Sequence, residues 1–176
     1  MDKWYAWISK QQGVRQLKPL SMPEKNIIYK LGKDRIIVFF PLPDKIGLMI
    51  ILKPFEDGWQ AGIYSLPEFR GKQVGARAYS AISKQLRKPI YSDSSQTSAS
   101  RYGVWYKLID MVPDRVAVYD QQEGHDIPWS MATGGPMAWG DQPVYVNKEW
   151  SLQRMLADPA TFRTRLLKLY PSDRPF

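Results

Sequence analysis

The hydrophobic pattern divides the first half of the chain into three short apolar runs and one longer periodic run. The short runs, at 34–41, 45–54 and 58–67, are rich in β-branched and aromatic residues and are separated by Pro-Asp or Asp-Gly turn signals. They predict three strands of an antiparallel meander. From Val74 to Leu86 the apolar residues recur about every 3.6 positions, which predicts an amphipathic helix of about four turns. The third strand therefore leads through a short loop into a helix.

Pro89 ends this helix, and the pattern then predicts short elements in alternation. They are a strand at 89–93, a helix at 99–110 that follows a Ser/Thr-rich stretch with N-capping groups, and strands at 114–120 and 143–147. Residues 121–142 lie between the last two strands and include several glycines and two tryptophans, which indicates a long loop. Such a loop is either a binding element or a surface loop held in place by its tryptophans.

The two ends of the chain are expected to be short elements or helices. Residues 1–20 predict an aromatic-rich strand or short helix, and residues 21–32 match a helix-capping pattern followed by a brief helix. Residues 148–157 are expected to be helical, and a last helix is expected from the N-cap Asp158 to about Leu169. The order of strands and helices predicts a mixed α/β (α+β) fold in which helices pack on one sheet.

Length and composition indicate a single globular domain over residues 1–176. The chain has 44% hydrophobic and 24% charged residues, and none of its apolar runs approaches the roughly 18 residues of a membrane helix. No membrane association is expected. The amino terminus alternates aromatic and polar residues without the apolar core of a secretory signal. We therefore expect a cytoplasmic location.

The cysteine and histidine content excludes several kinds of catalytic and metal site. The chain has no cysteine, which excludes disulfides, thiolate nucleophiles and sulfur-ligated zinc. His125 is its single histidine, so zinc enzymes of the HExxH type are excluded and a Ser/His/Asp triad must converge on this residue. The alternative for His125 is a histidine of a surface loop. No metal site is expected.

The charge balance favours anionic partners. Lys and Arg number 25 against 17 acidic residues, giving a net charge of +8, so nucleotides, nucleic acids and acidic surfaces are all suitable ligands. The excess is concentrated between Pro67 and Pro89, where Glu68 is the only acid. The most basic stretch is thus the loop that opens the predicted helix.

A glycine-bearing loop at the start of a helix suits a phosphate or pyrophosphate. The exposed backbone N–H groups and the positive end of the helix dipole favour an anion, and glycines allow a close approach of the backbone. The loop here contains Gly71 and Gly75. Neither GxGxxG nor GxxxxGK followed by Ser or Thr is present, which excludes the Rossmann and P-loop signatures.

One known pattern does fit this loop. The stretch SLPEFRGKQVGARAY, residues 65–79, resembles the acyl-coenzyme A loop of GNAT-type N-acetyltransferases: a strand, a Pro-Glu-aromatic step, then R/Q-x-x-G-x-G/A opening a helix. The resemblance covers roughly residues 34–120 and includes a meander before the loop and a splayed short strand and second helix after it. It departs at Gln73, where the family usually has its first glycine. The chain also resembles compact GNAT-like proteins carried by bacteriophages.

The resemblance implies a GNAT-like fold, with a mixed, mostly antiparallel sheet and helices on both faces, and acetyl-CoA or another acyl-CoA as cofactor. It further implies that the backbone of Tyr64, Ser65 and Leu66 pairs with the pantetheine arm. The loop amides would hold the pyrophosphate, from residues Arg70, Gly71, Lys72, Gln73, Val74, Gly75 and Ala76. The cations of Lys72 and Arg77 either add charge near the phosphates or belong to a solvated basic helix face.

Catalysis in this family is direct acyl transfer from the thioester to an amine, with a base for the amine and often a tyrosine acid for the leaving thiolate. Tyr106 stands where that tyrosine falls in the second helix, and a core aromatic is the alternative for it. The candidates for the base are Glu68, Asp93 and His125.

The sequence is compatible with two functions. The first is an acetyl-CoA-dependent N-acyltransferase acting on an amine of a protein, a small molecule or a nucleic-acid base. The alternative is a catalytically inactive GNAT-like nucleic-acid-binding or host-interaction protein, whose 7 tryptophans and 10 tyrosines would stack on bases. A homo-oligomer is compatible with either function.

Overall fold

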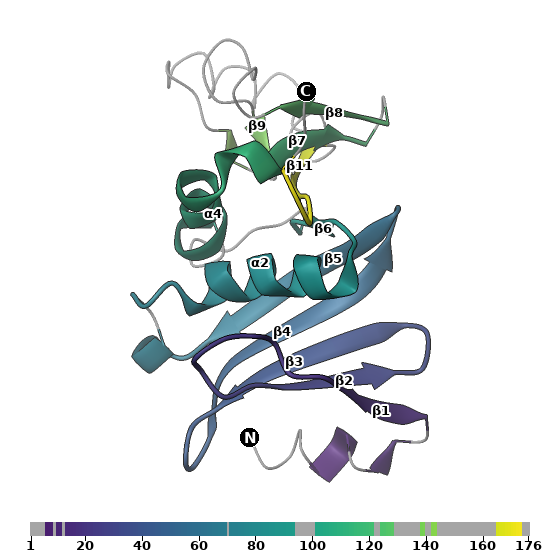
Figure 1. Cartoon of the computed structure of the whole chain (residues 1–176), viewed down its shortest axis with the longest axis vertical. Coiled ribbons are helices and arrows are strands. Elements are labelled where there is room, and N and C mark those ends of the chain that lie inside the picture. The colour runs from purple at the N-terminus through teal and green to yellow at the C-terminus, as the bar shows by residue number, and fades with distance from the viewer. Residues whose placement is uncertain are drawn as a thin grey trace.

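The computed structural model describes residues 6–8, 10–11, 13–69, 71–93, 101–121, 124–128, 138–139, 142–143 and 165–173. Within these residues the chain has a mixed α+β fold, dominated by a large and mostly antiparallel sheet (Figure 1). The helix predicted at 148–157 lies outside the described residues. So does the strand predicted at 143–147, apart from its first residue.

Five antiparallel strands form the first half of the sheet. In chain order they are β1 (Val14–Leu17), β2 (Ile27–Leu31), β3 (Arg35–Pro41), β4 (Ile46–Phe55) and β5 (Gly58–Ser65). The last three confirm the meander predicted from the hydrophobic runs. The brief helix predicted within 21–32 is wrong, because β2 occupies this segment. Its β-branched Ile27 and Ile28 pair with Phe39 and Val38 of β3.

A crossover helix connects the meander to the second half of the sheet. After the short 3₁₀ turn η1 (Pro67–Phe69) comes α2 (Val74–Leu86), which leads to the two-residue strand β6 (Ile90–Tyr91). β6 is parallel to β5. The helix and the short strand were both predicted. Figure 1 shows α2 lying across one face of the sheet.

The remaining elements include the last three strands of the large sheet. They are the π-helical turn η2 (Arg101–Trp105), α4 (Tyr106–Met111), the turn η3 (Pro113–Arg115), β7 (Val116–Asp120), β8 (His125–Pro128) and β11 (Arg165–Leu169). The strand order is β1-β2-β3-β4-β5-β6-β11-β7-β8, so β11 lies between β6 and β7. A separate two-stranded pair is formed by β9 (Ala138–Trp139) and β10 (Gln142–Pro143).

Two sequence predictions for the second half are wrong. The end of the last predicted helix, Arg165–Leu169, is the strand β11, which pairs with β6 and β7 on its two sides. The segment 121–142, predicted as a long loop, contains β8, which pairs with β7, as well as β9 and the first residue of β10. The pairings of β11 join residues far apart in the chain, and the local pattern of hydrophobic residues does not reveal them. The strands β7 and β8, like β9 and β10, are neighbours along the chain.

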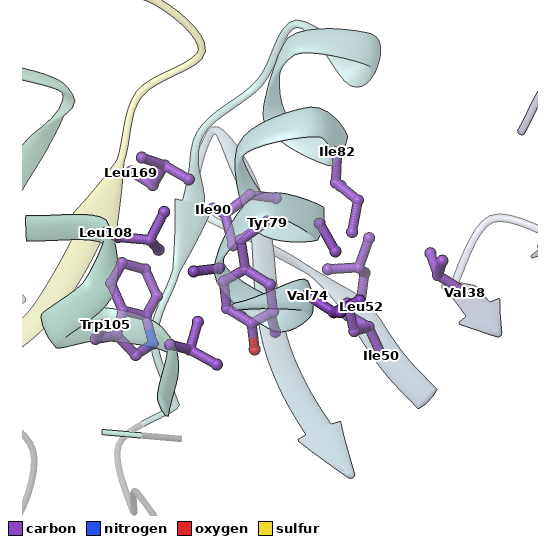
Figure 2. Close-up of a cluster of buried hydrophobic side chains, with 14 of the residues drawn as sticks. Val38, Ile50, Leu52, Val74, Tyr79, Ile82, Ile90, Trp105, Leu108 and Leu169 are labelled. Carbon is purple, nitrogen blue, oxygen red and sulfur yellow. The ribbon is translucent and has the colours of Figure 1, made fainter. Parts of the chain in front are cut away.

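The main core lies between the sheet and the two helices α2 and α4. Val74, Tyr79 and Ile82 of α2 pack there with Ile50 and other buried residues of the strands (Figure 2). A smaller cluster on the opposite face includes Ile8. The described helices therefore cover mainly one face of the sheet. None of the helices in the described part of the chain is long and apolar enough to cross a membrane.

Candidate functional site

The strands β5 and β6 separate after two residues. β6 pairs with β5 only at Trp59 and Gln60, whereas the pairing of β5 with β4 continues to Ser65. The Trp59 N–H donates to the Pro89 carbonyl on the β6 side (3.0 Å), and the Leu66 N–H donates to the Gly47 carbonyl of the β4 segment (2.8 Å). Backbone groups of an antiparallel strand alternate between its two sides.

By this alternation the N–H and C=O groups of Ile63 and Ser65 point away from β4, where β6 has already ended. We call Ile63–Ser65 the open edge of β5. Of the three residues predicted to pair with a pantetheine arm, Ser65 presents its backbone there, while the Leu66 N–H is already bonded to Gly47. Ile63 was not predicted, and counting two residues back from Ser65 identifies it.

The loop after β5 contains two left-handed residues, Gly71 with φ of 84° and Gln73 with φ of 57°. Glycine adopts this conformation freely, whereas a residue with a Cβ is disfavoured by roughly 1 kcal/mol or more. Gln73 therefore has the backbone conformation that glycine favours, at the position where the resemblance leads one to expect glycine. It is the N-cap residue of α2 and makes no side-chain capping bond. Arg70 lies outside the described residues.

The first turn of α2 is buried. Val74, Gly75 and Ala76 are all buried residues. A Cβ on Gly75 would lie 2.8 Å from Ile63 Cδ1 and 3.1 Å from Val104 Cγ2. Gly75 thus allows α2 to approach β5 and η2 closely. A large residue at this position would disturb the packing as well as any ligand site.

The cations of the loop differ in their surroundings. The Arg77 guanidinium forms two bonds with the Glu24 carboxylate, Nη1–Oε2 at 2.9 Å and Nη2–Oε1 at 2.5 Å, and Nη2 also donates to the Lys72 carbonyl at 3.0 Å. The hydrogen bond from Arg77 lowers the pKa of Glu24. Arg77 thus joins the β1–β2 connection to the loop. The Lys72 side chain is exposed.

The predicted acid and base residues are spread across the sheet. The Glu68 carboxylate is exposed and lies 2.6 Å from Lys45 Nζ, a hydrogen bond that lowers the pKa of Glu68. Tyr106 is half-buried against the main core. Asp93 is exposed just beyond β6, and the exposed His125 begins β8, opposite Asp120.

These positions cannot all serve one reaction centre. Glu68 follows β5 and His125 begins β8, and these strands are four positions apart in the sheet. At about 4.8 Å per strand, the lateral separation is about 19 Å. Only Asp93 follows the strand that diverges from β5.

Two buried side chains near this divergence were not predicted as site residues. Tyr79 of α2 and Trp105 of η2 are both completely buried, and their rings meet edge to face with centroids 5.7 Å apart. Among the residues that the structure describes, neither the Tyr79 hydroxyl nor the Trp105 Nε1 has a hydrogen-bond partner. Burial, and secondarily the charge of Asp93, raise the pKa of Tyr79. In the sequence, Tyr79 and Trp105 stand among the apolar residues of the two predicted helices, which indicates only that they belong to the core.

A groove of about 430 Å³ runs beside the start of β4 and the end of β5. Its lining residues are Lys45, Ile46, Gly47, Met49, Tyr64, Ser65 and Leu66. Met49, which pairs with Tyr64, belongs to the cluster on the face away from α2. The groove includes Ser65, so a molecule bound in it would reach the open edge from the side opposite α2.

A polar cluster around Lys168 of β11 lies in the second half of the sheet. The buried Lys168 ammonium lies 3.1 Å from Asp126 Oδ2 and 3.8 Å from Asp57 Oδ2. Three tyrosine rings lie within 4.8 to 5.4 Å of the same nitrogen, those of Tyr91, Tyr119 and Tyr170. The Tyr91 hydroxyl donates to Asp57. The charged groups pair with one another, which is typical of a structural ion pair.

Comparisons with known proteins leave the resemblance unsupported from outside the chain. The sequence matches no model of a protein family, no curated protein and no solved structure. In the part of the chain that the structure describes, no three His, Cys, Asp or Glu side chains gather to hold a metal ion. Any function must therefore be argued from the site itself.

Proposed function

We propose that the protein is an acyltransferase that uses acetyl-CoA, or another acyl-CoA, to acylate an amine. The observation that carries the proposal is the open edge of β5. A pantetheine arm contains amide groups and can pair with the backbone of Ile63 and Ser65 much as an added strand pairs with a sheet edge. The arm would lie where β6 leaves β5 after Gln60.

The loop at the end of the same strand supports binding of the phosphate end of the cofactor. Helical bonding in α2 begins with the Arg77 N–H, which donates to the Gln73 carbonyl at 3.0 Å. The earlier N–H groups have no acceptor within the helix, and they lie at the positive end of a 13-residue helix. The exposed Lys72 would add a positive charge beside them. The open edge and this helix terminus are consecutive in the chain.

The reaction would form a bond between the acceptor nitrogen and the thioester carbon and break the bond from that carbon to sulfur. A base removes a proton from the amine, and an acid gives one to the thiolate. Asp93 is the base that we propose, because it follows the strand that diverges from β5. Tyr106, which begins α4, is the acid. The acceptor amine would approach through the groove beside Ser65.

The alternative, nucleic-acid binding through stacked aromatic residues, finds less support. Among the described residues the large exposed hydrophobic side chains are Trp7, Tyr64 and Met111. Other aromatic residues, such as Trp105 and Tyr79, are enclosed in the core. An extended stacking surface needs successive exposed rings. The charge of +8 remains compatible with an acidic protein or a nucleic acid as the acceptor.

The open edge can be tested with two variants at one position. Ser65→Pro removes the N–H that points away from β4 and leaves the Leu66–Gly47 bond in place, a position at which a strand tolerates proline. Ser65→Ala keeps the N–H and removes only the hydroxyl, which donates to the Leu66 carbonyl at 3.2 Å.

Calorimetric titration with acetyl-CoA then separates the two effects. We expect wild type and Ser65→Ala to bind alike. Ser65→Pro should bind about five- to tenfold more weakly, which corresponds to one lost hydrogen bond. Equal affinities for all three proteins, with circular dichroism showing Ser65→Pro folded, would rule out the open edge as the binding surface. Absence of binding by the wild type would refute the proposed function.

A further inference from the structure

The two unpartnered donors in the core, the Tyr79 hydroxyl and the Trp105 indole N–H, call for a physical explanation. Both side chains are completely buried, and neither polar atom has a hydrogen-bond partner among the described residues. Buried polar groups in folded proteins are almost always hydrogen-bonded, because losing water without gaining a partner is unfavourable. The two side chains meet edge to face, and an acceptor from outside the described residues would supply the missing partner of each donor.

Tyr79 belongs to the part of α2 that packs against the open edge of β5. Tyr79 follows Gly75 by one helical turn, and side chains of a helix lean toward its N-terminus. Ile63 of the open edge and Val104 of η2 approach the helix at Gly75, in the turn that precedes Tyr79. Burial and, secondarily, the charge of Asp93 just beyond β6 raise the pKa of this hydroxyl.

Trp105 approaches the same place from the other side. It ends the π-helical turn η2, and its ring stands at 77° to that of Tyr79. Figure 2 shows the Trp105 ring beside that of Tyr79, with the indole nitrogen and the phenol oxygen both at the lower ends of their rings. The two donors therefore lie on the same side of the pair of rings.

We infer that the Tyr79 hydroxyl and the Trp105 N–H bind a carbonyl oxygen of the acyl-CoA in the gap between β5 and β6. This inference rests on the proposed function. A carbonyl oxygen has two lone pairs and can accept from both donors. Both donors are in completely buried residues, where a charged group is disfavoured, so a neutral carbonyl fits better than a phosphate.

The carbonyl has two sources in an acyl-CoA: the amides of the pantetheine arm and the thioester itself. Donors aimed at a thioester carbonyl would also stabilise the negative charge that develops on this oxygen during acyl transfer. Free CoA retains the amides and lacks the thioester. Comparing acetyl-CoA with free CoA therefore identifies which carbonyl the donors bind.

The test compares Tyr79→Phe with Tyr91→Phe. The Tyr91 hydroxyl is also in a buried residue but is bonded to Asp57, on the other side of the sheet. Without ligand, Tyr79→Phe should unfold at the same or a higher urea concentration than the wild type, because it removes an unpaired hydroxyl. Tyr91→Phe should unfold at a lower concentration.

The same proteins are then titrated with acetyl-CoA and with free CoA. Tyr79→Phe should bind acetyl-CoA about tenfold more weakly than the wild type, and Tyr91→Phe should bind it normally. A loss confined to acetyl-CoA assigns the thioester carbonyl, and an equal loss for both ligands assigns a pantetheine amide.

Three results would overturn the inference. An unchanged affinity of Tyr79→Phe for both ligands would overturn it and leave the acyltransferase proposal standing. A Tyr79→Phe protein that unfolds more easily than the wild type would show that the hydroxyl already has a partner in the folded chain. Failure of the wild type to bind either ligand would refute the proposed function and the inference together.

Discussion

Replacing Gln73 by glycine tests whether the loop has the backbone conformation that a phosphate-binding turn of this type requires. Gln73 has φ of 57° and forms no side-chain cap, so its side chain makes no evident contribution there. Arg87, at the other end of α2, has nearly the same φ of 55°. The two residues therefore carry the same kind of backbone strain, and only one of them lies in the loop.

The expected gain follows from two opposing effects. Relief of the left-handed strain contributes about 1 to 1.5 kcal/mol, and the greater freedom of glycine in the unfolded chain offsets about 0.5 kcal/mol of it. The net stabilisation is about 0.5 to 1 kcal/mol. For a chain of this size it raises the melting temperature by about 2 to 3 °C.

Differential scanning calorimetry of three variants measures this gain. Gln73→Gly and Arg87→Gly should both melt at a higher temperature than the wild type. Gln73→Ala retains a Cβ and should not. Because the backbone conformation stays the same, Gln73→Gly should also leave the acetyl-CoA affinity intact. A rise of equal size in Gln73→Ala, or no rise in either glycine variant, would refute the left-handed conformation as the origin of the effect.

Two further predictions concern the framework of the site. Arg77 holds the pKa of Glu24 below its ordinary value, so this pair stabilises the fold above the unfolded pKa and ceases to do so as the pH falls through the lower folded pKa. Glu24→Gln should therefore lower the free energy of unfolding by about 0.5 to 1 kcal/mol at pH 7. In urea titrations the difference between the two proteins should shrink as the pH falls below the ordinary Glu pKa of about 4.3; a difference that does not shrink on acidification would contradict this. Gly58→Ala should destabilise the fold by about 3 kcal/mol or more, because the added Cβ would lie 2.1 Å from the Pro89 carbonyl oxygen. In Gly62→Ala the added Cβ meets nothing within 4 Å, so this control variant should be tolerated in the same urea assay. Equal urea midpoints for the two variants would refute the close approach of β5 to Pro89.

The sequence predicted the parts of the fold that local pattern determines. The three runs that became β3, β4 and β5, together with α2 and β6, were found because their periodicity and turn residues are unambiguous. The segment of β11 was predicted as the end of a helix, since nothing in its sequence shows that it lies between β6 and β7. β2 was missed because a capping pattern precedes two β-branched residues whose partners lie in β3.

The candidate site was predicted less completely than the fold. The loop motif located Gly71, Gln73 and the start of α2, because a glycine-bearing turn before an amphipathic helix is visible in the sequence. The open edge depends on where β6 ends, and the unpartnered hydroxyl of Tyr79 depends on three-dimensional packing. Neither feature has a counterpart in the local pattern. Arg77, predicted as a cation near the phosphates or a solvated residue, instead forms an ion pair with Glu24.

The most direct test of the acyl-CoA proposal is amide hydrogen exchange of the wild-type protein with and without saturating acetyl-CoA. We predict slower exchange at Ile63 and Ser65 and in the loop at 71–76, with no change in β7, which lies three strands away from β5 in the sheet. Unchanged exchange at the open edge and the loop would contradict the claim that these backbone groups bind the cofactor.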